Sequence, residues 1–333
     1  MASAVLQLRP DPIALERRGT GGNGQPLVDA LRAAGEPTRL RILAILHDGE
    51  RTVSELAWVL GQSQPRVSRH LRILGDAGLI ERVAEGSWLF CRRSDHPVAR
   101  AVLSCLTDDE PGVRGDRERL AELRRRRTQD ALEYFQRHAH DWDRLRSLYV
   151  SESRVEAAVL DAIGDAPCDT LLDIGTGTGR MLQLLAPRAE TAIGIDSSAA
   201  MLAAARPTFE QPTLRHVQLR HGDMYRLPIA DASIDRVIIH QVLHFADDPE
   251  RVAREIARVL RPGGRALVVD FAPHALEFLR TDHAHRRLGF STDEVAGWGT
   301  RAGLTVREVT RLSGAPLTVV LWEAAKGHTD HPA

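Results

Sequence analysis

Three glycines at alternate positions, Gly175, Gly177 and Gly179, mark the segment whose residue types most clearly indicate a binding function. They follow a largely apolar run that ends at Ile174, and a helical pattern starts at Arg180. Where a strand turns directly into a helix, the first backbone N–H groups of the helix are free to bind an anionic group. Because glycine has no side chain, a ligand can approach this backbone closely. The segment therefore predicts a loop that holds a small ligand.

The spacing of these glycines distinguishes between two adenosine-containing ligands. A dinucleotide-binding loop requires glycine at positions 175, 177 and 180, whereas residue 180 is Arg and the third glycine is Gly179. The spacing favours S-adenosylmethionine (SAM) over NAD. Two carboxylates follow the next predicted strands: Asp196 can accept from both ribose hydroxyls, and Asp223 can accept from the adenine amine. Together these residues predict a site for an adenosyl ligand.

The elements that must position these residues alternate along the chain after Cys168. Apolar strand, turn and helix repeat, which is typical of a parallel sheet with helices on both faces. The predicted strands of this repeat are 169–174, 191–195, 214–220, 235–240 and 265–271. Two more, 304–311 and 317–323, are separated by a short turn and are expected to pair antiparallel at the sheet edge. The sequence thus predicts an α/β fold with a doubly wound, Rossmann-like and mostly parallel seven-stranded sheet.

A second group of residues, 52–74, has the pattern of two helices joined by a tight turn. Thr52 and Glu55 form a capping box, and Gly61 ends the first helix. Ser63 is expected to cap the second helix. The buried stripe of this second helix is predicted to be Val67, Leu71 and Leu74. Its outer face carries polar residues suited to bases and phosphates: Gln64, Arg66, Ser68, Arg69 and Arg72. We predict that this face binds DNA, and an ordinary polar surface helix is the alternative.

The segments on either side of this helix pair extend the pattern. Residues 80–83 and 88–92 are predicted to form a two-stranded hairpin, or wing, and 31–46 precedes the helix pair. Over roughly 80 residues the chain resembles winged-helix repressors of the ArsR/SmtB type. The resemblance implies a homodimer on a near-palindromic double-stranded DNA operator, with each recognition helix in a major groove. Many members sense metals through a Cys-x-Cys pair, but the corresponding helix here, 54–60, contains no cysteine, which argues against a zinc sensor.

From about Tyr134 to Ala324 the chain resembles class I SAM-dependent methyltransferases, especially the small-molecule branch that includes ubiquinone-type and arsenite-type enzymes. The resemblance implies four cofactor contacts: Asp173 with Gly175, Gly177 and Gly179 at the methionine portion, Asp196 at the ribose, Asp223 with Met224 at the adenine, and His240 near the sulfonium. Gln241 and His244 would line the acceptor side. For His240 and His244 both catalysis and pocket lining stay open, since methyl transfer often needs only proximity and alignment. Arsenite is not the expected acceptor, because Cys168 is the only thiol in this part.

Three further histidines, His274, His283 and His285, lie in or near 282–290, a segment that could cover the site. Their spacing matches no metal template, so we predict a polar loop and no metal ligands, with a metal site as the alternative. Cys91 and Cys105 lack a close ligand partner and are predicted to be packing residues.

Composition and length are those of a globular chain with two domains. The 333 residues are 43% hydrophobic and 27% charged, without an apolar run of the roughly 18–20 residues that span a bilayer. The start lacks the pattern of a signal peptide, and three cysteines cannot form a disulfide framework, so we expect a cytoplasmic protein. The predicted division is a flexible tail (1–25), a winged helix-turn-helix domain (26–106), a linker and helical lead-in (107–160), a SAM-dependent methyltransferase-like domain (161–326) and a second tail (327–333).

Charge contributes little to these predictions. The net charge is −1, and between residues 26 and 100 there are 11 Arg against 9 acidic residues. Lys326 is the only lysine among 44 basic residues, which indicates a coding bias rather than selection for guanidinium groups. The basic run 124–127 is accordingly predicted to be a solvated helix face, with a phosphate contact as the alternative.

The combination predicts a dimeric repressor whose rear domain senses SAM or its demethylated product S-adenosylhomocysteine (SAH), with sulfur and one-carbon metabolism genes as targets. An active small-molecule methyltransferase that controls its own expression is the second hypothesis. A metal-responsive repressor is the third, although the sequence offers it no ligands.

Overall fold

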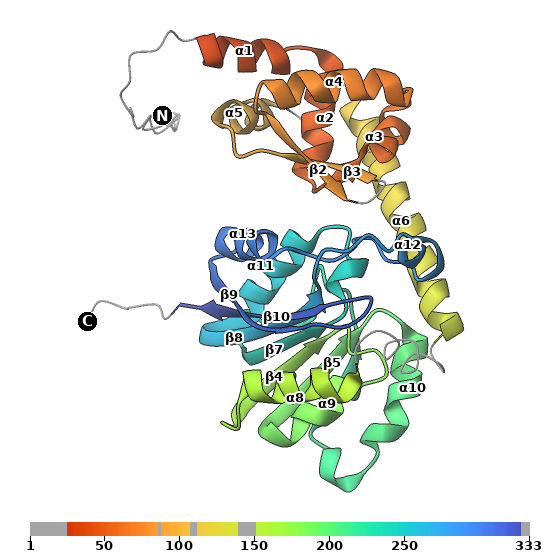
Figure 1. Ribbon diagram of the computed structural model, residues 1–333, viewed down its shortest axis with the longest axis vertical. Coiled ribbons are helices and arrows are strands. Elements are labelled where there is room, and N and C mark those ends of the chain that lie inside the picture. The colour runs from red at the N-terminus through yellow and green to blue at the C-terminus, as the bar shows by residue number, and fades with distance from the viewer. Residues whose placement is uncertain (1–24, 86–87, 107–111, 139–150, 328–333) are drawn as a thin grey trace, which may run out of the picture.

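The computed structural model describes residues 25–85, 88–106, 112–138 and 151–327. Two folded parts follow one another along the long axis of the molecule, and α6 runs beside both (Figure 1). Most of the first predicted tail, residues 107–111 and 139–150 of the predicted linker and lead-in, the wing-tip residues 86–87 and most of the second tail lie outside the described residues. No helix in the described ranges is long and apolar enough to cross a bilayer.

The N-terminal part is a winged helix-turn-helix. Its helices are α1 (Gln25–Ala34), α2 (Pro37–His47), α3 (Val53–Leu60), α4 (Gln64–Asp76), α5 (Pro97–Cys105) and the long α6 (Val113–His138). Its strands are β1 (Arg51–Thr52), β2 (Ile80–Glu85) and β3 (Trp88–Arg93), in the order β1-β3-β2. β2 and β3 pair antiparallel from Ile80 opposite Arg93 to Glu85 opposite Trp88, which confirms the predicted wing.

The helix-turn-helix forms largely for the local reasons that its sequence indicates. Thr52 accepts from the Glu55 backbone N–H, and Glu55 accepts from the Thr52 backbone N–H at 2.9 Å, which confirms the capping box. Gly61 ends α3 in the left-handed conformation with φ +64°. Ser63 is the N-cap residue of α4, as predicted, but its hydroxyl makes no capping hydrogen bond; its backbone carbonyl accepts from the backbone N–H groups of Arg66 and Val67.

The C-terminal part is a doubly wound α/β domain. Its strands are β4 (Cys168–Ile174), β5 (Ala189–Asp196), β6 (Val217–His221), β7 (Ile234–His240), β8 (Leu260–Phe271), β9 (Leu304–Leu312) and β10 (Val319–Lys326). Its α-helices are α8 (Glu152–Ile163), α9 (Arg180–Leu185), α10 (Ala199–Phe209), α11 (Pro249–Val259), α12 (Phe278–Asp282) and α13 (Thr292–Arg301). Short 3₁₀ helices are η1 (Ala186–Arg188), η2 (Pro212–Leu214) and η3 (Leu243–Phe245).

The sheet order β6-β5-β4-β7-β8-β10-β9 confirms the predicted seven-stranded sheet, parallel from β6 to β8 with an antiparallel β10–β9 pair at one edge. The third predicted strand begins later than expected, because residues 212–214 form η2 before β6. One apolar cluster joins the sheet to α11 and α13, and the other joins it to α8, α9 and α10. Helices therefore cover both faces. The order in which successive strands join the sheet reverses between the parallel neighbours β4 and β7, and such sheets bind ligands at this point, beyond the carboxyl ends of their strands.

Candidate functional site

The glycine loop between β4 and α9 has a backbone that only glycine adopts readily. Gly175, Gly177 and Gly179 have φ values of +69°, +54° and +84°. Packing adds a second requirement, since a Cβ on Gly175 would lie 2.4 Å from a methyl of Val242, and one on Gly179 would lie 2.5 Å from the ring of Phe209. These two glycines are therefore needed for the loop to form as well as for access to a ligand.

Replacing Gly175 with alanine is expected to lower the free energy of unfolding by about 1–3 kcal/mol, because the residue would carry both left-handed strain and a contact with Val242. Gly303 is a matched control: its φ is +80° and nothing lies within 4 Å of an added Cβ, so Gly303→Ala carries the strain alone. Chemical denaturation of both variants measures the difference. Equal losses would mean that the approach of Val242 does not constrain the loop.

Asp196 ties the glycine loop to the end of the neighbouring strand. Its carboxylate accepts from the backbone N–H of Gly177 and of Ser198, both at 2.8 Å. Burial raises the pKa of Asp196 above its usual value, and these two hydrogen bonds oppose the rise. The backbone carbonyl of Asp196 also accepts from Gly222, so the loops that follow β4, β5 and β6 are joined at one edge of the sheet.

Two other predicted cofactor residues flank this edge. Asp173, near the end of β4, is buried and accepts from the Thr176 hydroxyl at 2.7 Å. Asp223 is exposed beyond β6 and accepts from the backbone N–H of Tyr225, while Met224 packs against the core. The structure thus brings Asp173, Asp196 and the loop of Asp223 to the same side of the sheet.

The chemistry of these groups fits an adenosyl ligand. SAM and SAH present an ammonium, two ribose hydroxyls and an adenine amine, all of which donate hydrogen bonds. The three aspartates supply carboxylate acceptors at the carboxyl edge of consecutive strands, and charged acceptors form the stronger hydrogen bonds.

The histidines after β7 lie in a buried, aromatic region. His240 ends β7 and is 8% exposed. His244 is 2% exposed, and its Nδ1 lies 2.8 Å from the carboxylate of the fully buried Asp270. The ring of His285 stacks on that of His244 with a centroid separation of 4.0 Å. The sequence did not indicate that Asp270 is the partner of His244, because Asp270 lies on β8, 26 positions further along the chain.

Burial of His274 and His285 makes the stability of the protein depend on pH. Burial lowers the pKa of His274 to about 4 and that of His285 well below its usual value. The unfolded chain binds protons near pH 6.5 while the folded chain does not, so stability falls as the pH decreases from 6.5 toward 4. His285 alone contributes at most about 1.4 kcal/mol per pH unit.

The variant His285→Phe should weaken this dependence, because a phenylalanine ring can stack on His244 and near Phe271 as the imidazole does, but takes up no proton. Urea unfolding at pH 4.5, 5.5 and 6.5 provides the measurement. An unchanged slope in the variant would show that His285 is not kept neutral by its surroundings.

The segment predicted to be a polar loop is irregular, as expected, but it is not solvated. His285, Arg286 and Arg287 are 9%, 8% and 3% exposed. They are covered because this segment lies against the winged-helix part. In the described ranges no group of three or more potential ligands is arranged to hold a metal ion. Cys91 is buried, and burial raises the pKa of its thiol to about 12, whereas Cys105 is exposed.

The predicted DNA face is exposed on α4. Its five residues, Gln64, Arg66, Ser68, Arg69 and Arg72, all face solvent, while Val67, Leu71 and Leu74 are buried as predicted. Among the described residues, no carboxylate forms an ion pair with any of the three arginines of this face. The face therefore presents three uncompensated positive charges next to the wing.

The predicted solvated face at 124–127 is only partly confirmed. Arg125 pairs with Glu122 at the surface, but Arg124 donates to the backbone carbonyl of Asp48 at 3.0 Å, and the guanidinium of Arg126 lies over the ring of Trp58. Two of these arginines thus hold α6 against α3 and the end of α2.

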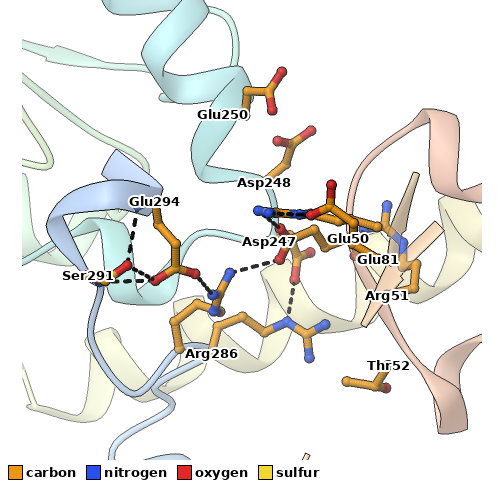
Figure 2. Close-up of polar contacts among 12 residues, drawn as sticks. Glu50, Arg51, Thr52, Glu81, Asp247, Asp248, Glu250, Arg286, Ser291 and Glu294 are labelled. Atoms are coloured by element: carbon orange, nitrogen blue, oxygen red, sulfur yellow. Dashed lines mark hydrogen bonds and ion pairs between the residues drawn. The ribbon is translucent and has the colours of Figure 1, made fainter. Parts of the chain in front are cut away.

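The ion pairs between the two parts are the feature that the sequence did not reveal. Arg286 pairs with Glu55 at 2.7 Å and Arg287 pairs with Glu50 at 2.9 Å. Figure 2 shows Arg286 between Asp247 and the segment that carries Glu50 and Thr52. The only signal was an Arg-Arg pair, which is uninformative in a chain whose basic residues are nearly all arginine.

Comparison with known families agrees with both halves of the structure. Residues 36–82 match the family described as "Bacterial regulatory protein, arsR family". Residues 172–268 match the family described as "Methyltransferase domain". The chain therefore joins an ArsR-type helix-turn-helix to a methyltransferase domain, and both resemblances predicted from the sequence are confirmed.

Individual relatives match only part of the chain. An uncharacterized 37.1 kDa protein in transposon TN4556 of Streptomyces fradiae is 33% identical over 170 residues, 47% of this chain and 46% of that protein. An arsenite methyltransferase of Halobacterium salinarum is 36% identical over 108 residues, 32% of this chain and 28% of that enzyme. This chain thus spans less than half the length of either relative.

Among solved structures, a chain of a Haloferax volcanii complex that contains the Trm112 methyltransferase activator is similar in fold. The TM-score is 0.50 at 22% identity, over 58% of this chain and 98% of that chain.

Proposed function

We propose that this protein is a DNA-binding transcriptional regulator, a repressor, whose methyltransferase domain binds SAM or SAH as its effector. The observation that carries the proposal is the presence in one chain of an exposed arginine-bearing recognition helix and a carboxylate-lined sheet edge, joined by buried ion pairs. Genes of the methionine and SAM cycle are the proposed targets.

Ligand binding is supported by the arrangement of the glycine loop and of three carboxylates. In this proposal Asp173 and the glycines hold the methionine portion, Asp196 the ribose, and Asp223 with Met224 the adenine. His240 lies at the end of β7, on the side proposed for the sulfonium.

DNA binding as a homodimer is supported by two surfaces. Gln64, Arg66, Ser68, Arg69 and Arg72 form the proposed contact with bases and phosphates. Leu27, Val28 and Leu31 form an apolar patch on α1 and are 55%, 39% and 50% exposed. A second copy of the chain is the proposed partner of this patch, because a two-fold dimer would present two recognition helices to successive major grooves.

The test is operator binding in the presence of each ligand. A duplex selected from a random pool by the full-length protein serves as operator, and fluorescence anisotropy measures its Kd with no ligand, with SAM and with SAH. A coupling of about 1–3 kcal/mol predicts a change of roughly 5- to 150-fold with at least one ligand. Unchanged operator affinity at saturating SAM and SAH would contradict the proposal.

Methyl transfer is a second candidate function, favoured by the buried pair of His244 and Asp270. Bound SAM would supply the methyl group, which moves to the acceptor as the bond from carbon to sulfur breaks. Asp270 would fix His244 through Nδ1, so that Nε2 could take the proton released by the acceptor. Incubation with labelled SAM and candidate acceptors tests this function, and His244→Asn should lower the rate of any transfer found. A lack of transfer to any acceptor would count against it.

A further inference from the structure

The segment Arg280–Leu288, here called the arginine loop, lies between the methyltransferase domain and the winged helix. On the methyltransferase side, the backbone carbonyl of His244 accepts from the backbone N–H of both Arg286 and Arg287, at 2.7 and 3.0 Å. The ring of His285 stacks on His244. The position of the arginine loop is therefore fixed by the segment that follows β7, beside the proposed cofactor edge.

On the other side, the same two arginines reach the start of the helix-turn-helix. Arg286 pairs with Glu55, whose carboxylate also accepts from the backbone N–H of Thr52 and so caps α3. Arg287 pairs with Glu50, just before β1. Both guanidinium groups are nearly fully buried, so solvent screens these pairs little.

Each arginine has a second partner within its own domain. Arg286 lies 3.1 Å from Asp247, and Arg287 lies 3.1 Å from Glu294, which forms the capping box of α13 with Ser291 (Figure 2). The two arginines thus link a helix start in the winged helix to fixed points in the methyltransferase domain.

A continuous set of contacts joins Asp247 to the loop proposed to hold the adenine. The Tyr225 hydroxyl accepts from the backbone N–H of Asp247 at 2.6 Å and from that of Asp248 at 3.3 Å. Tyr225 directly follows Met224, and its backbone N–H donates to Asp223. A shift of this loop would move Tyr225, and with it the carboxylate that holds Arg286.

The wing contacts the arginine loop as well. The guanidinium carbon of Arg280 lies 4.2 Å from the ring centroid of Trp88, and that of Arg287 lies 4.8 Å from that of Phe90. Both aromatic residues belong to β3, which pairs with β1 and β2. The arginine loop therefore touches α3 and the wing, the two elements that flank the recognition helix.

We propose that Arg286 and Arg287 are positioning residues that transmit occupancy of the adenosyl site to the helix-turn-helix, through Glu55 and Glu50. The inference rests on the proposed function, since it assigns the route by which that site would regulate DNA binding. Occupancy of the adenosyl site shifts the loop of Met224 and Tyr225 and the segment at His244. Because the arginine loop is bound to both, it shifts as well, and its ion pairs move the start of α3. The fork of each arginine restricts the geometry of its carboxylate partners, so the linkage transmits orientation as well as charge.

The test uses the full-length double variant Glu50→Ala/Glu55→Gln. It removes both interdomain ion pairs, yet Arg286 keeps Asp247 and Arg287 keeps Glu294, so neither cation is left buried alone. Glutamine at 55 retains an oxygen that can accept from Thr52 and cap α3. The matched control is Glu250→Ala, which removes a carboxylate paired with Arg254 and Arg301 inside the methyltransferase domain.

Three quantities are measured for each protein: the Kd for SAH and SAM by calorimetry, the Kd for the operator without ligand, and the ratio of operator Kd with and without ligand. We expect the double variant to keep its ligand Kd and its ligand-free operator Kd within about threefold of wild type. The ratio of its operator Kd with and without ligand should fall below about twofold. The control should keep the wild-type ratio. If these residues had only a structural role, the ratio would not fall while the affinities for ligand and for operator are preserved.

Small-angle scattering of the ligand-free proteins provides a readout independent of ligand sensing. The double variant should show a larger maximum dimension than wild type and the control, because the two ion pairs are lost and the contacts of the arginine loop with Trp88 and Phe90 must then hold it against the winged-helix part. A wild-type ratio retained in the double variant would overturn the inference. If operator binding by the wild-type protein responds to neither ligand, the proposed function fails. Scattering then tests the linkage between the two parts by itself, and an unchanged maximum dimension in the double variant overturns that linkage.

Discussion

Asp196→Ala is expected to raise the Kd for SAM and SAH about 30- to 150-fold, while the operator Kd of the ligand-free protein stays at its wild-type value. The carboxylate ends β5 next to the glycine loop, and its proposed contacts with two ribose hydroxyls are charge-assisted. Loss of such contacts costs about 2–3 kcal/mol, which corresponds to that range of Kd. Isothermal titration of each ligand measures the loss.

Two further variants separate ribose binding from damage to the loop. Asp196→Asn keeps one oxygen that can accept from Gly177, so it should show a smaller loss of affinity. Asp231→Ala removes an exposed carboxylate that precedes β7, at the opposite edge of the sheet, and should leave the ligand Kd unchanged. Wild-type ligand affinity in Asp196→Ala would show that the ribose assignment is wrong.

Removing two arginines from the recognition helix should have the largest effect on DNA binding. Arg69→Ala/Arg72→Ala is expected to raise the operator Kd at least 30-fold, since each guanidinium that pairs with a guanine or a phosphate contributes about 1–3 kcal/mol. The ligand Kd should stay unchanged, because α4 lies in the winged-helix part (Figure 1).

The salt dependence identifies the kind of contact that is lost. If the two side chains bind phosphates, the slope of log Kd against log salt becomes less steep by about 0.9 for each contact removed. Arg125→Ala is the control, because this arginine is exposed on α6 and pairs only with Glu122 among the described residues. An equal loss in the control and the double variant would refute a specific DNA face on α4.

Sequence alone predicted the elements that are determined by neighbouring residues. The capping box of Thr52 and Glu55 and the left-handed Gly61 follow from residue types three to nine positions apart, and the structure has both. The seven strands were predicted because apolar runs and turns alternate, but two starts were misplaced: β6 begins three residues later and β8 five residues earlier than predicted. Ser63 takes the predicted N-cap position of α4, although its hydroxyl makes no capping hydrogen bond.

Contacts between distant segments were beyond such reasoning. Arg286 and Glu55 are 231 positions apart, and no local pattern favours this carboxylate over the other acidic residues. The same holds for His244 and Asp270, which meet only because adjacent strands of the sheet are brought into register. The burial of 285–287 depends on the docking of two domains, so the sequence predicted a polar loop and gave no sign that its charged residues are buried.

In the proposed regulator, ligand occupancy and operator binding are linked, and linkage requires the effect to be equal in both directions. The most direct measurement is therefore the calorimetric Kd for SAH and for SAM, with and without a saturating concentration of the operator duplex. We expect the operator to change the Kd of the effector by the same factor, roughly 5- to 150-fold, by which the effector changes the Kd of the operator. Identical ligand Kd values with and without operator, for both SAM and SAH, would contradict it.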